Sequence, residues 1–264
     1  MPSWNFLTTE ITDKDFLIDC RNLSSFEEET ISGSYYCPFI KKAFGSDPDS
    51  QKKILGHLDA ILVQMKNDKK ERIVVFDEGM GMYSARMASL LRGAGFADTF
   101  IFEGKWPLPG KKAKGKNIIE GQPVKKLKSL SNVADRAYLE KNLTRVQIFD
   151  ARTPEEYEGK IPRFTSPEPG SLCGRLPGSY LWDWRTLFDA EGMLVDKVIF
   201  KKRLKAYPFM AERATVIYDY NGARSCLLAL MLSEAGYQEV YTYQGSWFEW
   251  RKTSLPKQAV AKFQ

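Results

Sequence analysis

The stretch "VIYDYNGARSC" at residues 216–226 places an acidic side chain, Asp219, between an apolar run and a glycine-containing turn. This order predicts a strand, a tight loop and then a helix, with the acid where the strand ends. A loop of this kind at a helix N-terminus points several backbone N–H groups at one spot, which suits an anion or a charged nucleophile. A similar stretch, "IVVFDEGMGMYSAR" at residues 73–86, also carries an acid, Asp77, after its apolar run.

Two acid–arginine pairs form a second kind of polar site. Asp19 and Arg21 end one apolar run, and Asp150 and Arg152 end another. Because alternate residues of a strand point to the same side, the members of each pair are expected to lie together at a sheet edge. For the first pair the pattern favours an ion pair that fixes the local loops. For the second pair an ion pair and a contact to a bound anion are equally consistent with it.

The thiols and the single imidazole do not form a metal-binding pattern. The four cysteines (Cys20, Cys37, Cys173 and Cys226) are widely spread without a CxxC pair, and His57 is the only histidine. No metal site and no cofactor are therefore expected. Cys20, Cys37 and Cys226 are interpreted as packing residues, and His57, on an amphipathic helix, as structural or surface. Cys173 lies in a loop and is the candidate for a reactive thiol.

Composition is that of a globular protein, with 43% hydrophobic and 27% charged residues in 264. The net charge of +6 is concentrated in residues 105–128, which hold eight lysines and one acid and leave the rest of the chain close to neutral. Glycine and proline separate these lysines, which favours a solvated linker over a nucleic-acid-binding face. No apolar run is long enough to span a membrane, and the N-terminus lacks the pattern of a signal peptide, so a cytoplasmic location is expected.

The chain repeats itself. "LLRGAGFADTFIFEGKW" at residues 90–106 is echoed by "LSEAGYQEVYTYQGSW" at residues 232–247, with two glycines and a tryptophan matched at a spacing of 141. The two acid–arginine pairs match at a spacing of 131. Each copy alternates short apolar strands with helices, which predicts a parallel sheet covered on both faces and a working site at the carboxyl ends of the strands. We expect an N-terminal domain at 1–107, a linker at 108–127 and a C-terminal domain at 128–264.

In the order of its motifs the chain resembles the tandem rhodanese family of thiosulfate and 3-mercaptopyruvate sulfurtransferases. The motifs are "DAR" at 150–152, "EEYEG" at 155–159, "GRLPGSY" at 174–180, "EGMLVD" at 191–196 and "YDYNGARS" at 218–225. The resemblance implies an α/β fold of two rhodanese-like domains, each a mainly parallel sheet flanked by helices. In the first copy, "FDEGMGMYSAR" resembles the same stretch of the family's non-catalytic domain.

The resemblance also implies the site residues. In this family the loop of the second domain holds a cysteine that carries sulfur as a persulfide, and Asp219 stands at that position. The positions that match the family's anion- or substrate-binding residues are Tyr220, Asn221, Gly222, Ala223, Arg224, Arg152 and Arg175. Arg175 replaces the family's histidine, and Leu172 occupies a stretch that is often basic in the family. An aspartate oxygen cannot hold a stable persulfide, and its charge would repel an anionic donor.

Three functions stay open at this point. The first is a catalytically degenerate rhodanese that keeps the fold as a binding or regulatory module. The second is an active sulfurtransferase that uses another thiol, with Cys173 as the candidate. The third is an enzyme that binds an oxyanion or phosphate through Arg152 and Arg224. A small anion such as thiosulfate, sulfate or phosphate and a protein are the expected partner classes; nucleic acid and membranes are not.

Overall fold

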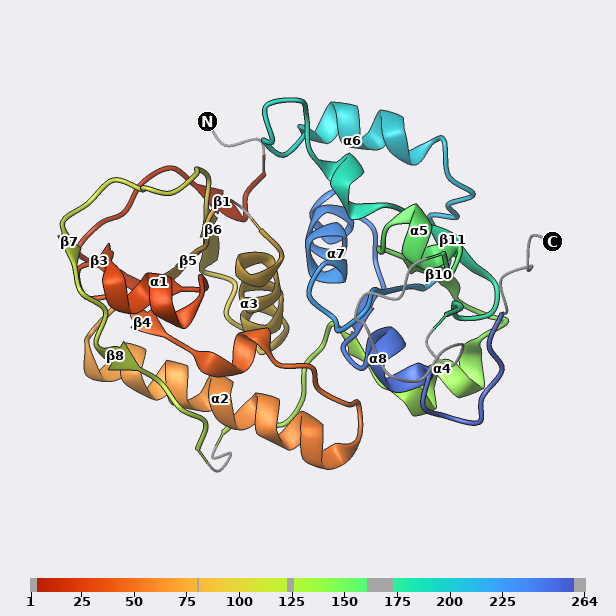
Figure 1. Cartoon of the computed structure of the whole chain (residues 1–264), viewed down its shortest axis with the longest axis horizontal. Helices are drawn as coiled ribbons and strands as arrows, with labels where there is room; N and C mark the ends of the chain where they lie inside the picture. The colour runs from red at the N-terminus through yellow and green to blue at the C-terminus, as the bar shows by residue number, and fades with distance from the viewer. Residues whose placement is uncertain (1–3, 80, 123–125, 161–172, 259–264) are drawn as a thin grey trace. The chain divides into compact units, whose positions relative to one another are not determined.

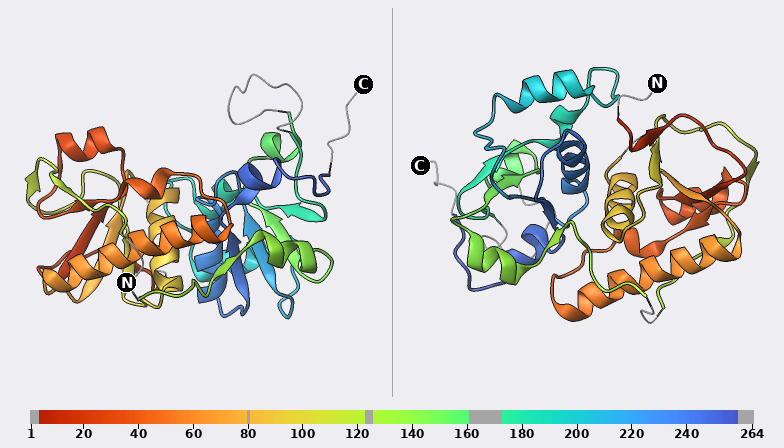
Figure 2. Two further views of the ribbon diagram at one scale, coloured as in Figure 1. Left: turned by 90° about the horizontal axis from the view of Figure 1, so that it is seen from below. Right: turned by 180° about the vertical axis from the view of Figure 1, so that it is seen from behind.

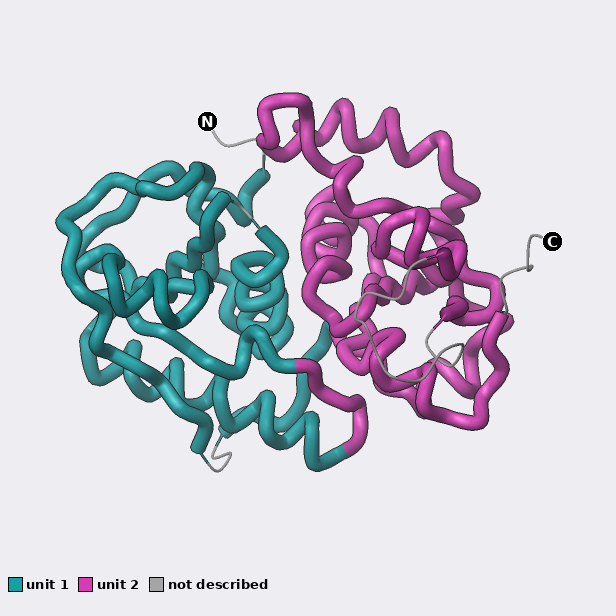
Figure 3. The backbone as a smooth tube through the Cα atoms, in the orientation of Figure 1, with its two compact units in different colours: residues 1–42, 48–132 teal, residues 43–47, 133–264 magenta. Residues whose placement is uncertain are grey.

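A computed structural model describes residues 4–79, 81–122, 126–160 and 173–258. It divides into two compact units: unit 1 comprises residues 1–42 and 48–132, and unit 2 comprises residues 43–47 and 133–264 (Figure 3). Among the described residues no helix is both long and apolar enough to cross a membrane.

Unit 1 is built on a six-stranded sheet whose neighbouring strands all run parallel (Figure 1). In spatial order the strands are β1 (Leu7–Thr8), β6 (Thr99–Phe102), β5 (Arg72–Phe76), β2 (Asp15–Asp19), β4 (Tyr35–Tyr36) and β8 (Asn117–Ile118). A separate antiparallel pair joins β3 (Thr30–Ile31) to β7 (Lys112–Ala113). The helices are α1 (Leu23–Glu28), the 3-10 helix η1 (Pro38–Lys41), α2 (Pro48–Asn67) and α3 (Met82–Gly93).

Unit 2 repeats this plan with a five-stranded parallel sheet. In spatial order the strands are β11 (Ser179–Leu181), β10 (Gln147–Asp150), β12 (Thr215–Tyr218), β13 (Val240–Tyr243) and β9 (Val133–Ala134). The helices are α4 (Arg136–Asn142), α5 (Pro154–Tyr157), the 3-10 helix η2 (Trp184–Leu187), α6 (Lys197–Leu204), α7 (Ser225–Glu234) and α8 (Ser246–Trp250). Figure 2 shows helices on both sides of the strands in each unit, as the sequence predicted for short, fully apolar strands.

Register places the two sites at equivalent points of the two sheets. In unit 1, Asp19 at the end of β2 pairs with Phe76, the last residue of β5, so Asp77 follows immediately. In unit 2, Asp150 at the end of β10 pairs with Tyr218, the last residue of β12, so Asp219 follows immediately. The helices α3 and α7 begin after these loops and pack against the strands that precede them. The predicted fold, two α/β domains with mainly parallel sheets flanked by helices, is confirmed.

The lysine-rich segment differs from the linker expected at 108–127. Its strands β7 and β8 pair with β3 and β4, and Leu108 and Ile119 are buried, so this part of the chain is integrated into unit 1, which extends to residue 132. The lysines themselves are mostly exposed, which is why the composition resembled a linker while the apolar residues between them anchor the backbone.

Unit 2 includes a short piece of chain that lies, in sequence, within unit 1. Ser46 donates from its backbone N–H and its hydroxyl to the two carboxylate oxygens of Glu249 (3.0 and 2.7 Å), and its hydroxyl accepts from the backbone N–H of Arg136 (2.9 Å). The hydroxyl of Tyr243 donates to the same carboxylate (2.5 Å). Residues 43–47 are therefore bound to unit 2 by side chains that come much later in the sequence.

Candidate functional site

The loop after β12 is organised by the carboxylate of Asp219, a side chain without exposed surface. Its Oδ1 accepts from the backbone N–H groups of Asn221 (2.8 Å) and Gly222 (3.1 Å), and its Oδ2 accepts from that of Ser225 (2.9 Å). Gly222 has a φ of +80°, and a Cβ there would lie 2.7 Å from the carbonyl oxygen of Gln244. The turn therefore requires glycine, and it brings three N–H groups onto one carboxylate.

The surroundings keep Asp219 ionised. Burial by itself raises the pKa of this carboxyl, but the charge of Arg224 and the bonds from the N–H groups of Ser225 and Asn221 outweigh it, and the pKa lies below its usual value. Asp219 is thus a fixed negative charge that the loop already satisfies with its own backbone.

A buried ion pair connects this loop to α5. Arg224 donates from Nη1 and Nη2 to the two carboxylate oxygens of Glu156 (2.6 and 3.0 Å), and both side chains are buried. Burial raises the pKa of Glu156, but the hydrogen bond and charge of Arg224 bring it below the usual value. Glu156 also closes a capping box with Thr153 at the start of α5, so the position of its carboxylate is fixed from both sides.

The second acid–arginine pair is also internal. Arg152 binds Asp150 through Nε (2.9 and 3.0 Å) and Nη2 (2.6 Å), and its Nη2 donates in addition to the carbonyl oxygen of Gly174 (2.8 Å). The hydroxyl of Tyr218 donates to the same carboxylate (2.5 Å). Burial lowers the pKa of Arg152, but the charge of Asp150 more than compensates, and the pKa is raised. Of the two interpretations left open for this pair, the contacts match the ion pair.

Unit 1 contains the corresponding arrangement. The Oδ1 of Asp77 accepts from the N–H groups of Gly79 (3.2 Å) and Gly81 (2.7 Å), and its Oδ2 accepts from that of Ser84 (3.1 Å). Arg21 binds Asp19 through Nε (3.1 and 3.2 Å) and Nη2 (2.8 Å), as the sequence predicted for this pair. The same two motifs therefore build the same hydrogen bonds in both units.

The remaining predicted site residues occupy less polar surroundings. Arg175 donates to the carbonyl oxygen of Tyr157 (3.3 Å) and lies 4.3 Å over its ring. Tyr220 packs edge-on against Phe248, and Ala223 is fully buried. Asn221 is 9% exposed, with no partner for its Oδ1 among the described residues. Leu172 lies outside the described residues.

The cysteines differ in accessibility. Three of them (Cys20, Cys37 and Cys226) are buried, and only Cys173 is partly exposed. Burial raises the pKa of Cys20, to which Asp77 adds, and burial also raises that of Cys37, so neither favours the thiolate form. The thiol of Cys226 donates to the carbonyl oxygen of Gly222 (3.3 Å) and is a packing group, as its helical pattern indicated.

His57 stacks on the ring of Phe39, with centroids 4.5 Å apart, and burial followed by the charge of Lys42 lowers its pKa. It therefore has the surroundings of a structural residue. No group of three or more potential metal ligands exists among the described residues.

One residue of the site was not assigned a role from the sequence. Glu156 belongs to the quoted motif "EEYEG", yet its partner Arg224 lies 68 residues away, so the pairing could not be read from spacing. The capping-box pattern Thr153-x-x-Glu156 did hold a usable signal for the position of the carboxylate.

The sequence is similar to those of known sulfurtransferases. The thiosulfate/3-mercaptopyruvate sulfurtransferase 1, mitochondrial, of Arabidopsis thaliana is 25% identical over 224 residues, which cover 73% of this chain and 58% of that protein. The sulfurtransferase 2 of the same plant is 24% identical over 219 residues, 69% of this chain and 60% of that protein. The chain thus spans about three-fifths of the length of these relatives.

Solved structures share the fold. A probable thiosulfate sulfurtransferase matches with a TM-score of 0.65 and 20% identity, over 94% of this chain and 99% of that one. The Tum1 protein from Saccharomyces cerevisiae matches with a TM-score of 0.68 and 18% identity, over 98% and 99%. The model of the rhodanese-like domain matches residues 4–107 and 134–253. The chain therefore belongs to the rhodanese-like domain family and carries two of its domains in tandem.

Proposed function

We propose that this protein is a catalytically degenerate member of the sulfurtransferase family, which keeps the rhodanese fold as a binding or regulatory module. The proposal rests on the buried carboxylate of Asp219 in the loop after β12, which by the order of the sequence motifs stands where the family's cysteine is expected. Sulfur transfer needs a thiolate that can hold the sulfur as a persulfide. A carboxylate fits the same set of N–H groups but cannot carry the sulfur.

The contacts around Asp219 support the same conclusion. The N–H groups of Asn221, Gly222 and Ser225 are all bonded to it. The guanidinium groups of Arg152 and Arg224 are bonded to Asp150 and Glu156. An oxyanion such as thiosulfate or phosphate would have to compete with these buried carboxylates for the same donors, which weakens the case for an oxyanion-binding enzyme at this loop.

A second candidate function rests on the partial exposure of Cys173. The next residue, Gly174, accepts a hydrogen bond from Arg152, so this thiol lies one residue from the arginine network of unit 2. An active sulfurtransferase that uses Cys173 in place of the loop cysteine is therefore the alternative.

A location in the cytoplasm stays a prediction, and one relative is mitochondrial by name.

The two candidates differ in one measurement. The full chain is incubated with thiosulfate or mercaptopyruvate, and its intact mass is recorded before and after cyanide treatment. We expect no gain of a cyanide-labile sulfur atom and no sulfurtransferase turnover. A sulfur adduct that disappears in the Cys173→Ala variant, together with turnover, would reject the degenerate function and establish Cys173 as the sulfur carrier. The Cys226→Ala variant is the matched control, because that thiol is buried.

A further inference from the structure

A polar pocket of unit 1 lies where two short strand pairs come together. β3 pairs with β7 and β4 pairs with β8, so residues 32–34 and 114–116 each connect one strand pair to the other, and both connections line the pocket. The pocket has a volume of about 410 Å³. Three hydroxyl side chains, one amide and two lysines line it, with glycine and alanine as the remainder. This volume falls within the range of small-molecule sites.

Ser34 is one of the residues that line this pocket, and its hydroxyl is buried. Its side chain is 2% exposed, and its Oγ has no hydrogen-bond partner among the described residues. Its backbone groups are used, because its N–H donates to the carbonyl oxygen of Ile31 (3.0 Å) and its carbonyl accepts from Asn117 Nδ2 (3.4 Å). Buried hydroxyl groups are nearly always hydrogen-bonded, so this one is available to bond a group that enters the pocket.

The charge of the lining indicates the sign of the charge on a ligand of this pocket. Lys114 and Lys116 are exposed, and neither forms an ion pair within the described part of the chain. The lining contains no acidic residue. Two ammonium groups beside hydroxyl donors attract a compact anion, and lysine binds phosphate-type groups as a point charge.

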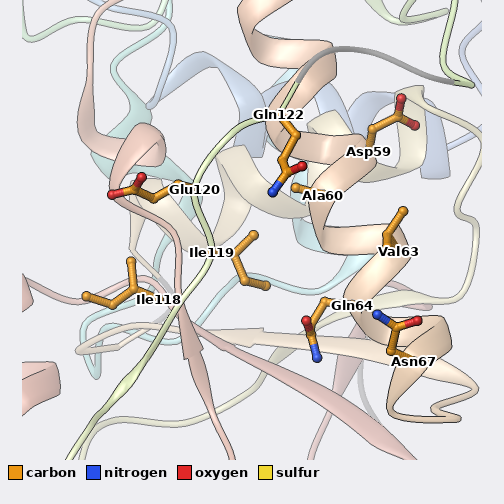
Figure 4. Close-up of a pocket in the computed structure, with 9 residues that line it drawn as sticks. All are labelled: Asp59, Ala60, Val63, Gln64, Asn67, Ile118, Ile119, Glu120 and Gln122. Carbon is orange, nitrogen blue, oxygen red and sulfur yellow. The ribbon is translucent and has the colours of Figure 1, made fainter.

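A second pocket of unit 1 has a lining of different charge and polarity. The pocket of Figure 4, about 280 Å³, lies between α2 and residues 118–122. Its lining includes Asp59 and Glu120 and the apolar side chains Val63, Ile118 and Ile119. The pocket at Ser34 differs from this one because it carries lysines and hydroxyl groups and no acidic side chain.

The backbone around the pocket is fixed at two points. Between the two lysines, the N–H of Gly115 donates to the carbonyl oxygen of Phe26 in α1 (3.0 Å), and a Cβ on Gly115 would lie 2.3 Å from that oxygen. In the other connection, the N–H of Ser32 donates to the carbonyl oxygen of Lys111 (2.7 Å). A site whose frame is already ordered loses less entropy on binding.

We propose that this pocket is a binding site for the phosphate- or sulfate-type group of a small anionic molecule, with Ser34, Lys114 and Lys116 as its principal contacts. The lining has neither arginine nor an aromatic ring, which distinguishes it from a surface that binds nucleic acid through stacked bases. The site belongs to unit 1 and is independent of the loop at Asp219.

Titration of the full chain at physiological ionic strength tests the proposal, with inorganic phosphate, inorganic sulfate, an alkyl phosphate and an alkyl sulfonate as probes. Binding is followed by amide NMR shifts, with Ser34 and Gly115 as reporters. We expect saturable shifts at these amides with at least one probe. The Lys114→Gln/Lys116→Gln variant should bind about tenfold more weakly, since both ammonium contacts are lost. Preference for phosphates or for sulfur oxyanions identifies the source of the ligand group.

Two controls make the result decisive. Ser34→Ala removes an unpartnered hydroxyl, so the fold should be kept while affinity falls about threefold or more. Lys52→Gln/Lys53→Gln makes the same change in net charge at exposed positions of α2 and should leave the affinity unchanged. Equal weakening in the α2 variant would show that the anion follows net charge only, and the proposal would be rejected. Absence of shifts at Ser34 and Gly115 with all four probes would reject it as well.

Discussion

The loops at Asp77 and Asp219 are stabilised in the same way in the two units. In each loop, one carboxylate accepts hydrogen bonds from three backbone N–H groups. In unit 1 these belong to the residues two, four and seven positions after the aspartate. In unit 2 they belong to the residues two, three and six positions after it. The two sets of bonds are nearly equal although the second loop is one residue shorter. The acid in the second unit thus reproduces the bonding of the first.

The units differ in the charges next to the loop. In unit 2 the buried pair of Arg224 and Glu156 links the loop to α5. The repeat spacings of 141 and 131 place Tyr83 and Ser25 at the matching positions of unit 1, and neither carries a charge at neutral pH. The carboxylate therefore suffices to organise the loop, whereas the ion pair is an additional feature of the second unit.

Removal of one partner of this ion pair should have the largest effect on stability. Glu156→Ala leaves the guanidinium of Arg224 buried without its carboxylate, and we expect a loss of about 3–5 kcal/mol in the free energy of unfolding. Chemical denaturation of the full chain measures it. Ser25→Ala, at the matching position of unit 1, should change stability by no more than about 0.5 kcal/mol. Equal losses in both variants would contradict the difference drawn between the units.

Replacement of each loop aspartate by asparagine should have the next largest effect. An amide NH2 cannot accept the N–H of Ser225 in unit 2 or of Ser84 in unit 1, so one buried donor loses its partner in each case. We expect Asp219→Asn and Asp77→Asn each to cost about 1–3 kcal/mol of stability. Thermal unfolding of the two variants side by side tests the equivalence. A variant as stable as the wild type would show that its loop does not depend on the carboxylate.

Cysteine in the same two positions separates the loops by their electrostatics. Arg224 and the loop N–H groups lower the pKa of the Asp219 carboxyl despite its burial. The thiol of Asp219→Cys should therefore titrate below the usual value of about 8.5. The thiol of Asp77→Cys, without an arginine at the matching position, should titrate higher.

The pH dependence of iodoacetamide alkylation, located by peptide mass mapping, measures both thiols. An Asp219→Cys thiol that titrates at or above the usual value would mean that burial outweighs the N–H groups once the carboxylate is gone. The two loops would then share their hydrogen bonds to a carboxylate, but neither would stabilise a thiolate.

Acid should weaken unit 2 through the same carboxylates, with the smallest of the four effects. The pKa values of Asp219 and Glu156 lie below their usual values. Their contribution to stability is therefore complete above the unfolded values of about 4 and is lost as the pH falls through the folded values. Denaturation midpoints should stay level from about pH 7 to 5 and fall below about pH 4. Glu156→Gln should show a shallower fall, and an unchanged slope would contradict this assignment.

The sequence was sufficient for the features that depend on local pattern. Asp19 and Arg21 could be paired from their spacing of two residues, although only Asp19 lies on β2 and Arg21 follows it. The amphipathic helix expected around His57 is α2, which spans Pro48–Asn67. Features that depend on distant partners were not accessible in this way. The lysines in 105–128 showed only that part of this segment is exposed to solvent. The burial of Leu108 and Ile119 depends on pairing with strands that precede them by about 80 residues.

The binding of residues 43–47 to unit 2 has a consequence for the order in which the protein can fold during its synthesis. Ser46 is made 90 residues before Arg136 and 203 residues before Glu249, the partners of its side chain. At about 5–20 residues per second, the ribosome needs on the order of ten to forty seconds to add the later partner. Unit 1 can close its sheet in that time, but the segment between η1 and α2 must wait for the C-terminal part of the chain. A fragment that starts at residue 133 would lack this segment, so the second unit is completed by a piece of chain that is translated long before it.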